Sequence, residues 1–111
     1  MDSSSAIEAF SALAQSTRLA VFRLLIQEGS PGLPAGAIAD HFKVLPSTLS
    51  THLAILTRAG LLRSKRVQRQ VFYSADMDGI GALVCFLTED CCHGHPEVCA
   101  GLSDAMKAYG G

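Results

Sequence analysis

The chain has 111 residues, of which 49% are hydrophobic, so it can form one domain with its own core and is not disordered throughout. No apolar run approaches the roughly 20 residues of a membrane-spanning helix, and the first residues lack the basic and apolar regions of a signal peptide. We therefore expect a cytoplasmic protein with no membrane partner, whose four cysteines are reduced thiols or metal ligands rather than disulfides.

The formal net charge of -1 conceals an uneven distribution of charged side chains. Residues 1–40 carry two cations against four acids, and residues 76–111 carry one cation against six acids. Residues 41–75 carry six cations and no acid. This central stretch can present a positive face to a polyanion such as nucleic acid, although an ordinary solvated surface can show the same pattern.

The first 42 residues predict three helices. Apolar residues at helical spacing indicate a first helix over residues 6–14, with Ser3, Ser4 or Ser5 as its N-cap. A second helix is expected to begin after Ser16 or Thr17 as its cap and to end near Gly29. Residues 29–34 hold two glycines and two prolines and are expected to form a loop, followed by a short helix over residues 35–42.

The next predicted helix runs from Pro46, which is tolerated in a first turn, to Arg58, with Gly60 ending it. Three leucines four and three residues apart form an apolar stripe along it. Its other side carries short polar side chains: Ser47, Thr48, Ser50, Thr51 and His52. Two short helices, the second with such a surface, are typical of a helix-turn-helix that reads a DNA major groove, with a plain surface helix as the alternative.

A change of period then predicts a β-hairpin, with strands over residues 62–66 and 70–74 joined by residues 67–69. The hairpin carries four cations that we expect to contact phosphates or a minor groove: Arg63, Lys65, Arg66 and Arg69. The predicted fold class is therefore mainly α with a two-stranded β wing, a winged helix-turn-helix.

A last long helix is predicted from Met77 to about Glu89, with an apolar stripe of Ile80, Leu83, Val84 and Leu87. Cys85 lies near this stripe and is expected to be a buried structural thiol. A short helix is expected over residues 102–109. The apolar stripes of the first and last long helices exceed what one chain needs to bury, so we expect a homodimer formed through them. We divide the chain into a DNA-binding and dimerisation domain, residues 1–90, and a C-terminal segment, residues 91–111.

Three ordered segments resemble the ArsR/SmtB family of bacterial metal-responsive repressors, over roughly residues 6 to 90. The sequence from Gln15 to Leu25 is similar to the family's opening motif, residues 47–62 to its recognition helix and entry into the wing, and residues 71–74 to its second wing strand. The resemblance implies a homodimer that binds operator DNA when empty and releases it when a metal or metalloid binds. Two recognition helices related by a two-fold axis imply an inverted-repeat operator.

The chain also departs from this family pattern. Gln68 stands where a glycine is usual at the wing tip, and Leu45 stands where a serine or threonine commonly caps the recognition helix. The helix around residues 37–41 lacks the Cys-x-Cys pair of the best-known arsenic and cadmium sensors, and the last long helix lacks the His-rich ligands of the zinc sensors. A metal site must therefore lie elsewhere.

Three thiols and two imidazoles follow the last long helix within nine residues: Cys91, Cys92, His93, His95 and Cys99. Three soft thiolates suit As(III) or Sb(III), and the cluster resembles the C-terminal arsenic site of a subset of the family. A set of three cysteines with His93 or His95 would instead suit Zn(II), and Cd(II) also favours thiolates. A structural zinc site, a redox-sensing thiol pair and incidental cysteines remain alternatives.

These observations predict a DNA-binding repressor, not an enzyme, that leaves its operator when a metalloid binds to Cys91, Cys92 and Cys99. An enzyme acting through the vicinal cysteines is the first rival, but the sequence has no nucleotide motif, paired general base or Cys-x-x-Cys to support it. A metal-storage module is the second rival, and it would leave the acid-free basic stretch without a purpose.

Overall fold

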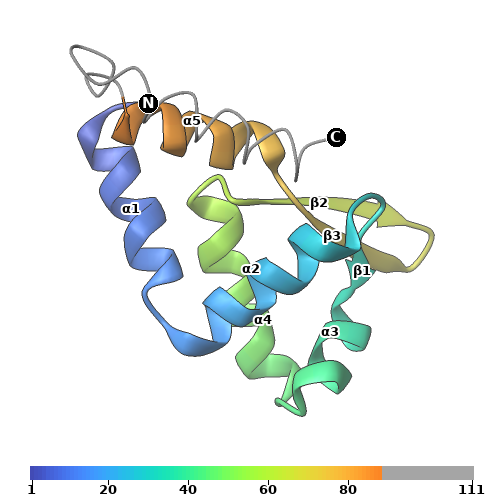
Figure 1. Cartoon of the computed structure of the whole chain (residues 1–111). Coiled ribbons are helices and arrows are strands. Elements are labelled where there is room, and N and C mark those ends of the chain that lie inside the picture. The colour runs from blue at the N-terminus through green and yellow to red at the C-terminus, as the bar shows by residue number, and fades with distance from the viewer. Residues whose placement is uncertain (89–111) are drawn as a thin grey trace.

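The computed structural model describes residues 1–88, which form five helices and a small sheet (Figure 1). In chain order the elements are α1 (Ser3–Leu13), α2 (Ser16–Glu28), β1 (Leu33–Pro34), α3 (Ala35–Phe42), α4 (Pro46–Arg58), β2 (Leu62–Val67), β3 (Gln70–Ala75) and α5 (Met77–Leu87). No single helix within residues 1–88 is long and apolar enough to cross a membrane, and α1 and α2 reach that length and hydropathy only as a pair bent by 98°. The segment 91–111 and its predicted helix lie outside the described residues.

The caps of the first two helices differ from those predicted. The carboxylate of Asp2 accepts a hydrogen bond from the Ser5 backbone N–H at 2.8 Å, so Asp2 is the N-cap of α1. The side-chain oxygen of Gln15 accepts one from the Arg18 N–H at 2.8 Å and caps α2. The predicted serine and threonine caps are therefore wrong, because those residues lie inside the helices. In both helices the residue just before the first helical residue has a side chain that accepts a hydrogen bond and serves as the N-cap.

The sheet has three antiparallel strands in the order β1-β3-β2, rather than the two predicted. The extra strand is β1, where Leu33 pairs with Tyr73 and Pro34 with Phe72, so the loop prediction is wrong at these two residues. β2 and β3 pair from Leu62 opposite Ala75 to Val67 opposite Gln70, one residue longer each than predicted. A proline is tolerated in β1 because it is an edge strand. The fold class itself, mainly helical with a β wing, is confirmed.

The core is aliphatic and centres on α4. Its three stripe leucines are at most 1% exposed, and they belong to one cluster with Val21, Leu25 and Ile38. α4 contacts α1, α2, α3 and β2, and it lies in the middle of the molecule in Figure 1. Each buried leucine side chain stabilises the fold by about 2 kcal/mol. The helix is therefore fixed along one side by packing, and its other side is left free.

α5 is less buried than its apolar stripe predicts. Leu83 is 2% exposed, but Leu87 is 58% exposed at the end of the helix. The helix lies beside α1 in Figure 1 and contacts it. Cys85 is an exposed free thiol, so the prediction that it is buried is wrong: it lies on a side of α5 that nothing within residues 1–88 covers.

Candidate nucleic-acid interface

Four of the side chains predicted to contact DNA bases form the exposed side of α4: Ser47, Thr48, Ser50 and Thr51. Residues three and four positions apart share one side of a helix, so their hydroxyls make a continuous polar surface. The Thr51 hydroxyl lies 3.4 Å from the Ser47 carbonyl oxygen, to which it donates, and stays exposed. Short uncharged donors and acceptors on an accessible helix are suited to base edges in a major groove.

His52 differs from these four residues because it is half-buried and engaged within the chain. Its Nδ1 lies 3.3 Å from Nη1 of Arg18, which belongs to α2. The sequence predicted that this imidazole contacts DNA. The structure brings it to the boundary between the polar surface of α4 and the interior.

A tight turn connects α3 to α4. Lys43 adopts a left-handed conformation, with φ of 55°, and its N–H donates to the Asp40 carbonyl at 3.3 Å. The Val44 N–H donates to the Ala39 carbonyl at 3.1 Å. Leu45 then precedes α4 with no side-chain capping bond and is 70% exposed. This short turn between two helices has the geometry of a helix-turn-helix.

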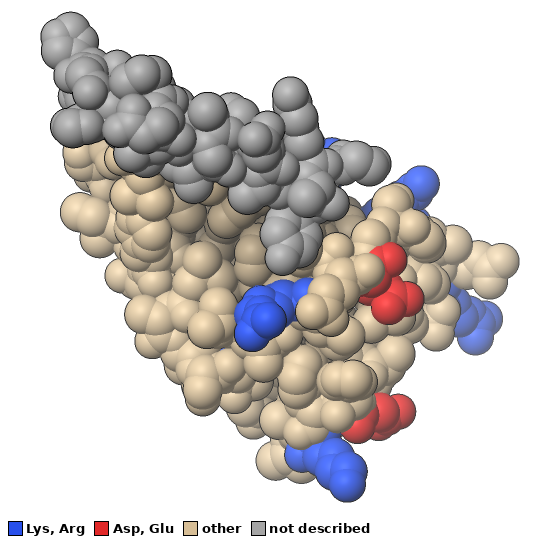
Figure 2. All heavy atoms as spheres, viewed as in Figure 1, with Lys and Arg blue, Asp and Glu red and all other residues tan. Residues whose placement is uncertain are grey.

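The β2–β3 hairpin projects from the body of the molecule and carries exposed cations. Lys65, Arg66 and Arg69 are all exposed, and Figure 2 shows basic side chains at the end where the hairpin lies. Gln68 and Arg69 form the turn, and Gln68 takes a positive φ of 58°, a conformation that glycine adopts most easily. Nε of Arg66 donates to the Gln68 carbonyl at 3.3 Å across this turn.

Arg63, at the base of the hairpin, is bound to two carboxylates. Its Nη2 lies 3.2 Å from Asp76 and 2.8 Å from Asp78. These contacts, Asp76 first, raise the pKa of Arg63. Partial burial acts to raise the pKa of Asp76, but hydrogen bonds from the Gly79 N–H and from Arg63 outweigh it and hold the pKa below the usual range. Within residues 1–88, Arg63 is the one of the four predicted wing cations that forms ion pairs.

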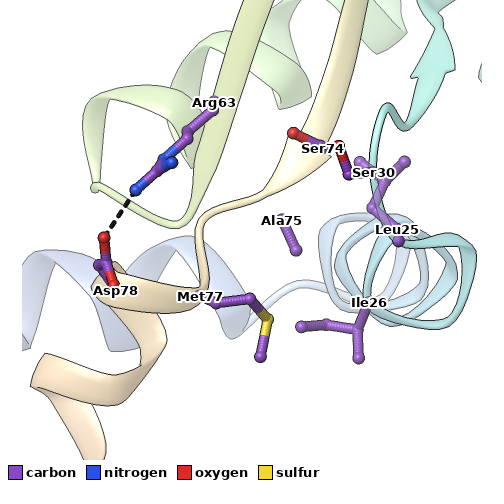
Figure 3. A pocket seen from close by; sticks show the side chains of 9 residues that line it. Leu25, Ile26, Ser30, Arg63, Ser74, Ala75, Met77 and Asp78 are labelled. Carbon is purple, nitrogen blue, oxygen red and sulfur yellow. Dashed lines mark hydrogen bonds and ion pairs between the residues drawn. The ribbon is translucent and has the colours of Figure 1, made fainter. Parts of the chain in front are cut away.

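The same carboxylates join the wing to α5, a junction that the sequence analysis missed. Asp76 caps α5 by accepting from Gly79, and its own N–H donates to the Leu61 carbonyl at 2.9 Å. Figure 3 shows Arg63 reaching toward Asp78 at one side of a pocket, with Ile26 of α2 at the opposite side and Met77 between them. The pocket has a volume of about 260 Å³. The sequence signal for this junction is the pair of acids, Asp76 and Asp78, directly after the acid-free stretch.

The start of α5 also lies against the end of α4. A Cβ added at Gly79 would lie 1.9 Å from the Gly60 carbonyl oxygen, so only glycine allows this approach. The end of the recognition helix, the base of the wing and the start of α5 therefore meet within a few residues of one another.

The predicted thiol ligands Cys91, Cys92 and Cys99 lie outside the described residues, as do His93 and His95. Within residues 1–88, no group of three or more histidine, cysteine, aspartate or glutamate residues is arranged to hold a metal ion.

Comparison with known proteins agrees with this geometry. A family model described as a helix-turn-helix domain matches residues 13–65, from the end of α1 into β2. An uncharacterized HTH-type transcriptional regulator of Bacillus subtilis (strain 168), YbzH, is 33% identical over an alignment that covers 73% of this chain and 93% of the relative.

Solved structures show the same similarity. HlyU from Vibrio cholerae N16961 is 28% identical, with a TM-score of 0.64 over 81% of this chain and 95% of that one. The homodimeric winged helix-turn-helix DNA-binding domain of Mb0332 from Mycobacterium bovis, a possible ArsR-family transcriptional regulator, is 26% identical. Its TM-score is 0.63, over 83% of this chain and 86% of that one.

Proposed function

The chain belongs to the helix-turn-helix transcriptional regulators of the ArsR and HlyU type, and we propose that it is a repressor released from DNA by As(III) or Sb(III). In this proposal, a homodimer binds an inverted-repeat operator, and the metalloid binds to Cys91, Cys92 and Cys99. The observation that carries the DNA-binding part is the accessible hydroxyl surface of α4 beside the exposed cations of the wing, in a stretch of chain without an acid.

The two parts of this surface have different tasks. Hydroxyl groups on α4 can hydrogen-bond to base edges, and this gives sequence preference. Lys65, Arg66 and Arg69 lie on a hairpin that projects beyond the helix, so they are suited to phosphates or to an adjacent minor groove. Phosphate contacts supply much of the affinity and make it depend on salt.

Dimerisation through α1 and α5 is supported by exposed apolar side chains on both helices. Ile7 is 66% exposed, Phe10 40% and Leu87 58%, and because α1 contacts α5, these side chains can contribute to one apolar surface that a second copy would cover. We expect Ile7→Asp to convert the dimer into a monomer in analytical ultracentrifugation, because a charge would have to be buried. Leu19→Asp places the same charge at an exposed position of α2, outside the proposed α1 and α5 interface, and should leave the dimer intact. Dissociation of both variants, or of neither, would contradict the assignment.

The metalloid part rests on the chemistry of the cysteine cluster. Arsenous acid can exchange its three hydroxyl groups for the sulfur atoms of three thiols. Each thiol proton leaves with a hydroxyl group as water, so three waters are released and no oxidation state changes. Thiolates are soft ligands and suit thiophilic ions such as As(III) and Sb(III). His93 and His95 within the same nine residues favour the second candidate, a zinc-responsive repressor with a site of three cysteines and one histidine.

Release of DNA follows if the metalloid binds the free protein more tightly than the DNA-bound protein. The cluster begins four residues after Leu87, the last residue of α5, and the start of α5 is joined to the end of α4 and to the wing. Closing a ring of three thiolates can therefore change the position of α5 and, through this junction, the spacing of the two recognition helices. Allosteric coupling between two sites typically amounts to about 1 to 3 kcal/mol, which would suffice here.

The direct test is a titration followed by fluorescence anisotropy. The full chain is added to a labelled duplex taken from just upstream of its own gene, and arsenite or zinc is then added. Release by arsenite alone supports the proposal, and release by zinc alone favours the second candidate. If neither releases the duplex, the metalloid part is wrong; if the duplex is not bound in low salt, the DNA-binding part is wrong.

Cysteine variants locate the site. Cys91→Ser, Cys92→Ser and Cys99→Ser should each keep DNA binding and lose the arsenite response. Cys85→Ser is the matched control because that thiol is exposed on α5 outside the cluster, and it should respond like the wild type. An arsenite response that survives in all three cluster variants would contradict the site assignment.

A further inference from the structure

Arg18 joins three helices that are separate in sequence. It lies in the first turn of α2, and its side chain contacts both α1 and α4. Nε donates to the Ala12 carbonyl at 2.6 Å and Nη2 donates to the Ser11 carbonyl at 3.5 Å. Nη1 lies 3.3 Å from Nδ1 of His52 on α4. One guanidinium therefore connects the end of α1 with the helix that carries the candidate base contacts.

The contacts on α1 are of a kind that a helix end needs. The last carbonyls of a helix have no partner within it and carry partial negative charge, which a cation stabilises. α1 has no basic residue in its own last turn, and Arg18 of the following helix takes this place.

The contact on α4 lies beside the polar surface. His52 directly follows Thr51, one of the exposed hydroxyl residues, and it is half-buried at the edge of that surface. For Arg18 to donate to Nδ1, the neutral imidazole must carry its proton on Nε2. The flat guanidinium presents several donors in fixed directions, so one side chain can hold α1 and α4 at a set angle.

We propose that Arg18, acting through His52, is a positioning residue that sets the orientation of the recognition helix relative to α1. This inference rests on the proposed function, because it requires α1 to form part of the dimer interface. The distance between the two recognition helices of the dimer then depends on the angle between α1 and α4 in each chain. That distance selects the separation of the operator half-sites. Arg18 would thus determine which half-site spacing the dimer accepts, without contacting DNA.

The test measures binding against half-site spacing. A half-site is first selected from random duplexes with the wild-type full chain, and the inverted repeat is then rebuilt with its spacing changed one base pair at a time. Anisotropy titrations at one salt concentration give the affinity for each duplex and for a single half-site. We expect the wild type to show a narrow optimum of spacing.

Arg18→Ala should weaken binding at the optimal spacing by about tenfold and flatten the dependence on spacing, while affinity for the single half-site stays within about twofold. His52→Ala should flatten the profile in the same way. His52→Asn keeps a side-chain acceptor and should restore part of the preference. Arg23→Ala is the matched control, since it removes the same charge from an exposed position of the same helix and should leave the profile sharp.

The outcomes separate the inference from the proposed function. If the wild type binds with a sharp optimum and both Arg18→Ala and His52→Ala keep it, the positioning role is wrong and the proposed function stands. An equal loss of affinity at every spacing also contradicts the inference, because it indicates a general loss of folded protein. If Arg18→Ala does not fold, His52→Ala decides, since it leaves the contacts with α1 in place. Failure of the wild type to bind any selected duplex contradicts the proposed function and this inference with it.

Discussion

Leu45 occupies the N-cap position of α4 without providing a capping hydrogen bond, and its side chain is 70% exposed. A serine there can accept a hydrogen bond from a free backbone N–H of the first turn. We predict that Leu45→Ser raises the free energy of unfolding by about 1 kcal/mol, measured by urea denaturation. Leu45→Ala removes the same side chain without adding a cap, so the difference between the two variants isolates the hydrogen bond. Equal stability of the two variants would show that the first turn of α4 needs no side-chain cap.

Asp76 combines a cap and an ion pair in one carboxylate. Its pKa is lowered in the folded chain, so its charged form contributes stability above the pKa of the unfolded chain, about 4, and this contribution is lost as the pH falls through the lowered value. Asparagine caps helices as well as aspartate does, so Asp76→Asn keeps the bond with Gly79 and removes only the charge. We predict that the variant loses less stability than the wild type between pH 5 and pH 2, followed by urea denaturation at each pH. Parallel curves for the two proteins would contradict this role of the carboxylate.

At the scale of whole elements, the junction between α4 and α5 depends on Gly79. A methyl group there would overlap the Gly60 carbonyl oxygen, so the two helices would have to separate. We predict that Gly79→Ala lowers the free energy of unfolding by about 2 kcal/mol in urea denaturation. Gly36→Ala is the control, because its Cβ would meet no atom within 4 Å, and its higher helix propensity should stabilise α3 by about 0.5 kcal/mol. If both variants lose a similar free energy of unfolding, the loss in Gly79→Ala does not come from overlap with the Gly60 carbonyl oxygen.

The extents of the elements show what the sequence can predict. α4 begins and ends at the predicted residues because Pro46 and Gly60 mark its ends and its leucines fix its buried side. β1 was not predicted, because Leu33 and Pro34 belong to a stretch rich in glycine and proline, which is typical of a loop. They form a strand only by pairing with β3, some 40 residues later in the chain. Local sequence signals thus predict an element whose ends are marked by its own residues. An element that forms only by pairing with a distant segment cannot be predicted without the tertiary structure.

The same distinction holds for the candidate interface. The hydroxyl residues of α4 and the cations of the wing were identified because residue type and helical or strand period determine their exposure. The contact of Arg18 with His52 joins residues 34 positions apart, and Arg63 reaches Asp78 across 15 positions. The periodicity of apolar residues in the sequence does not reveal contacts between residues so far apart. The sequence therefore predicted the exposed residues that we propose as the DNA-contact surface, but not the contacts that hold that surface in place.

For the molecule as a whole, the separation of charge predicts how DNA binding depends on salt. Each cation that contacts a phosphate releases counterions, so removing one should reduce the slope of log affinity against log salt by about 1. We predict this for Arg66→Ala and for Arg69→Ala, with weaker binding to every duplex sequence. Arg63→Ala should change the slope less, because Asp76 and Asp78 already neutralise that charge, and Arg23→Ala on α2 should not change it. Anisotropy titrations at several salt concentrations measure all four slopes. If the slope is unchanged in both Arg66→Ala and Arg69→Ala, the wing does not contact DNA, and α4 alone must account for binding.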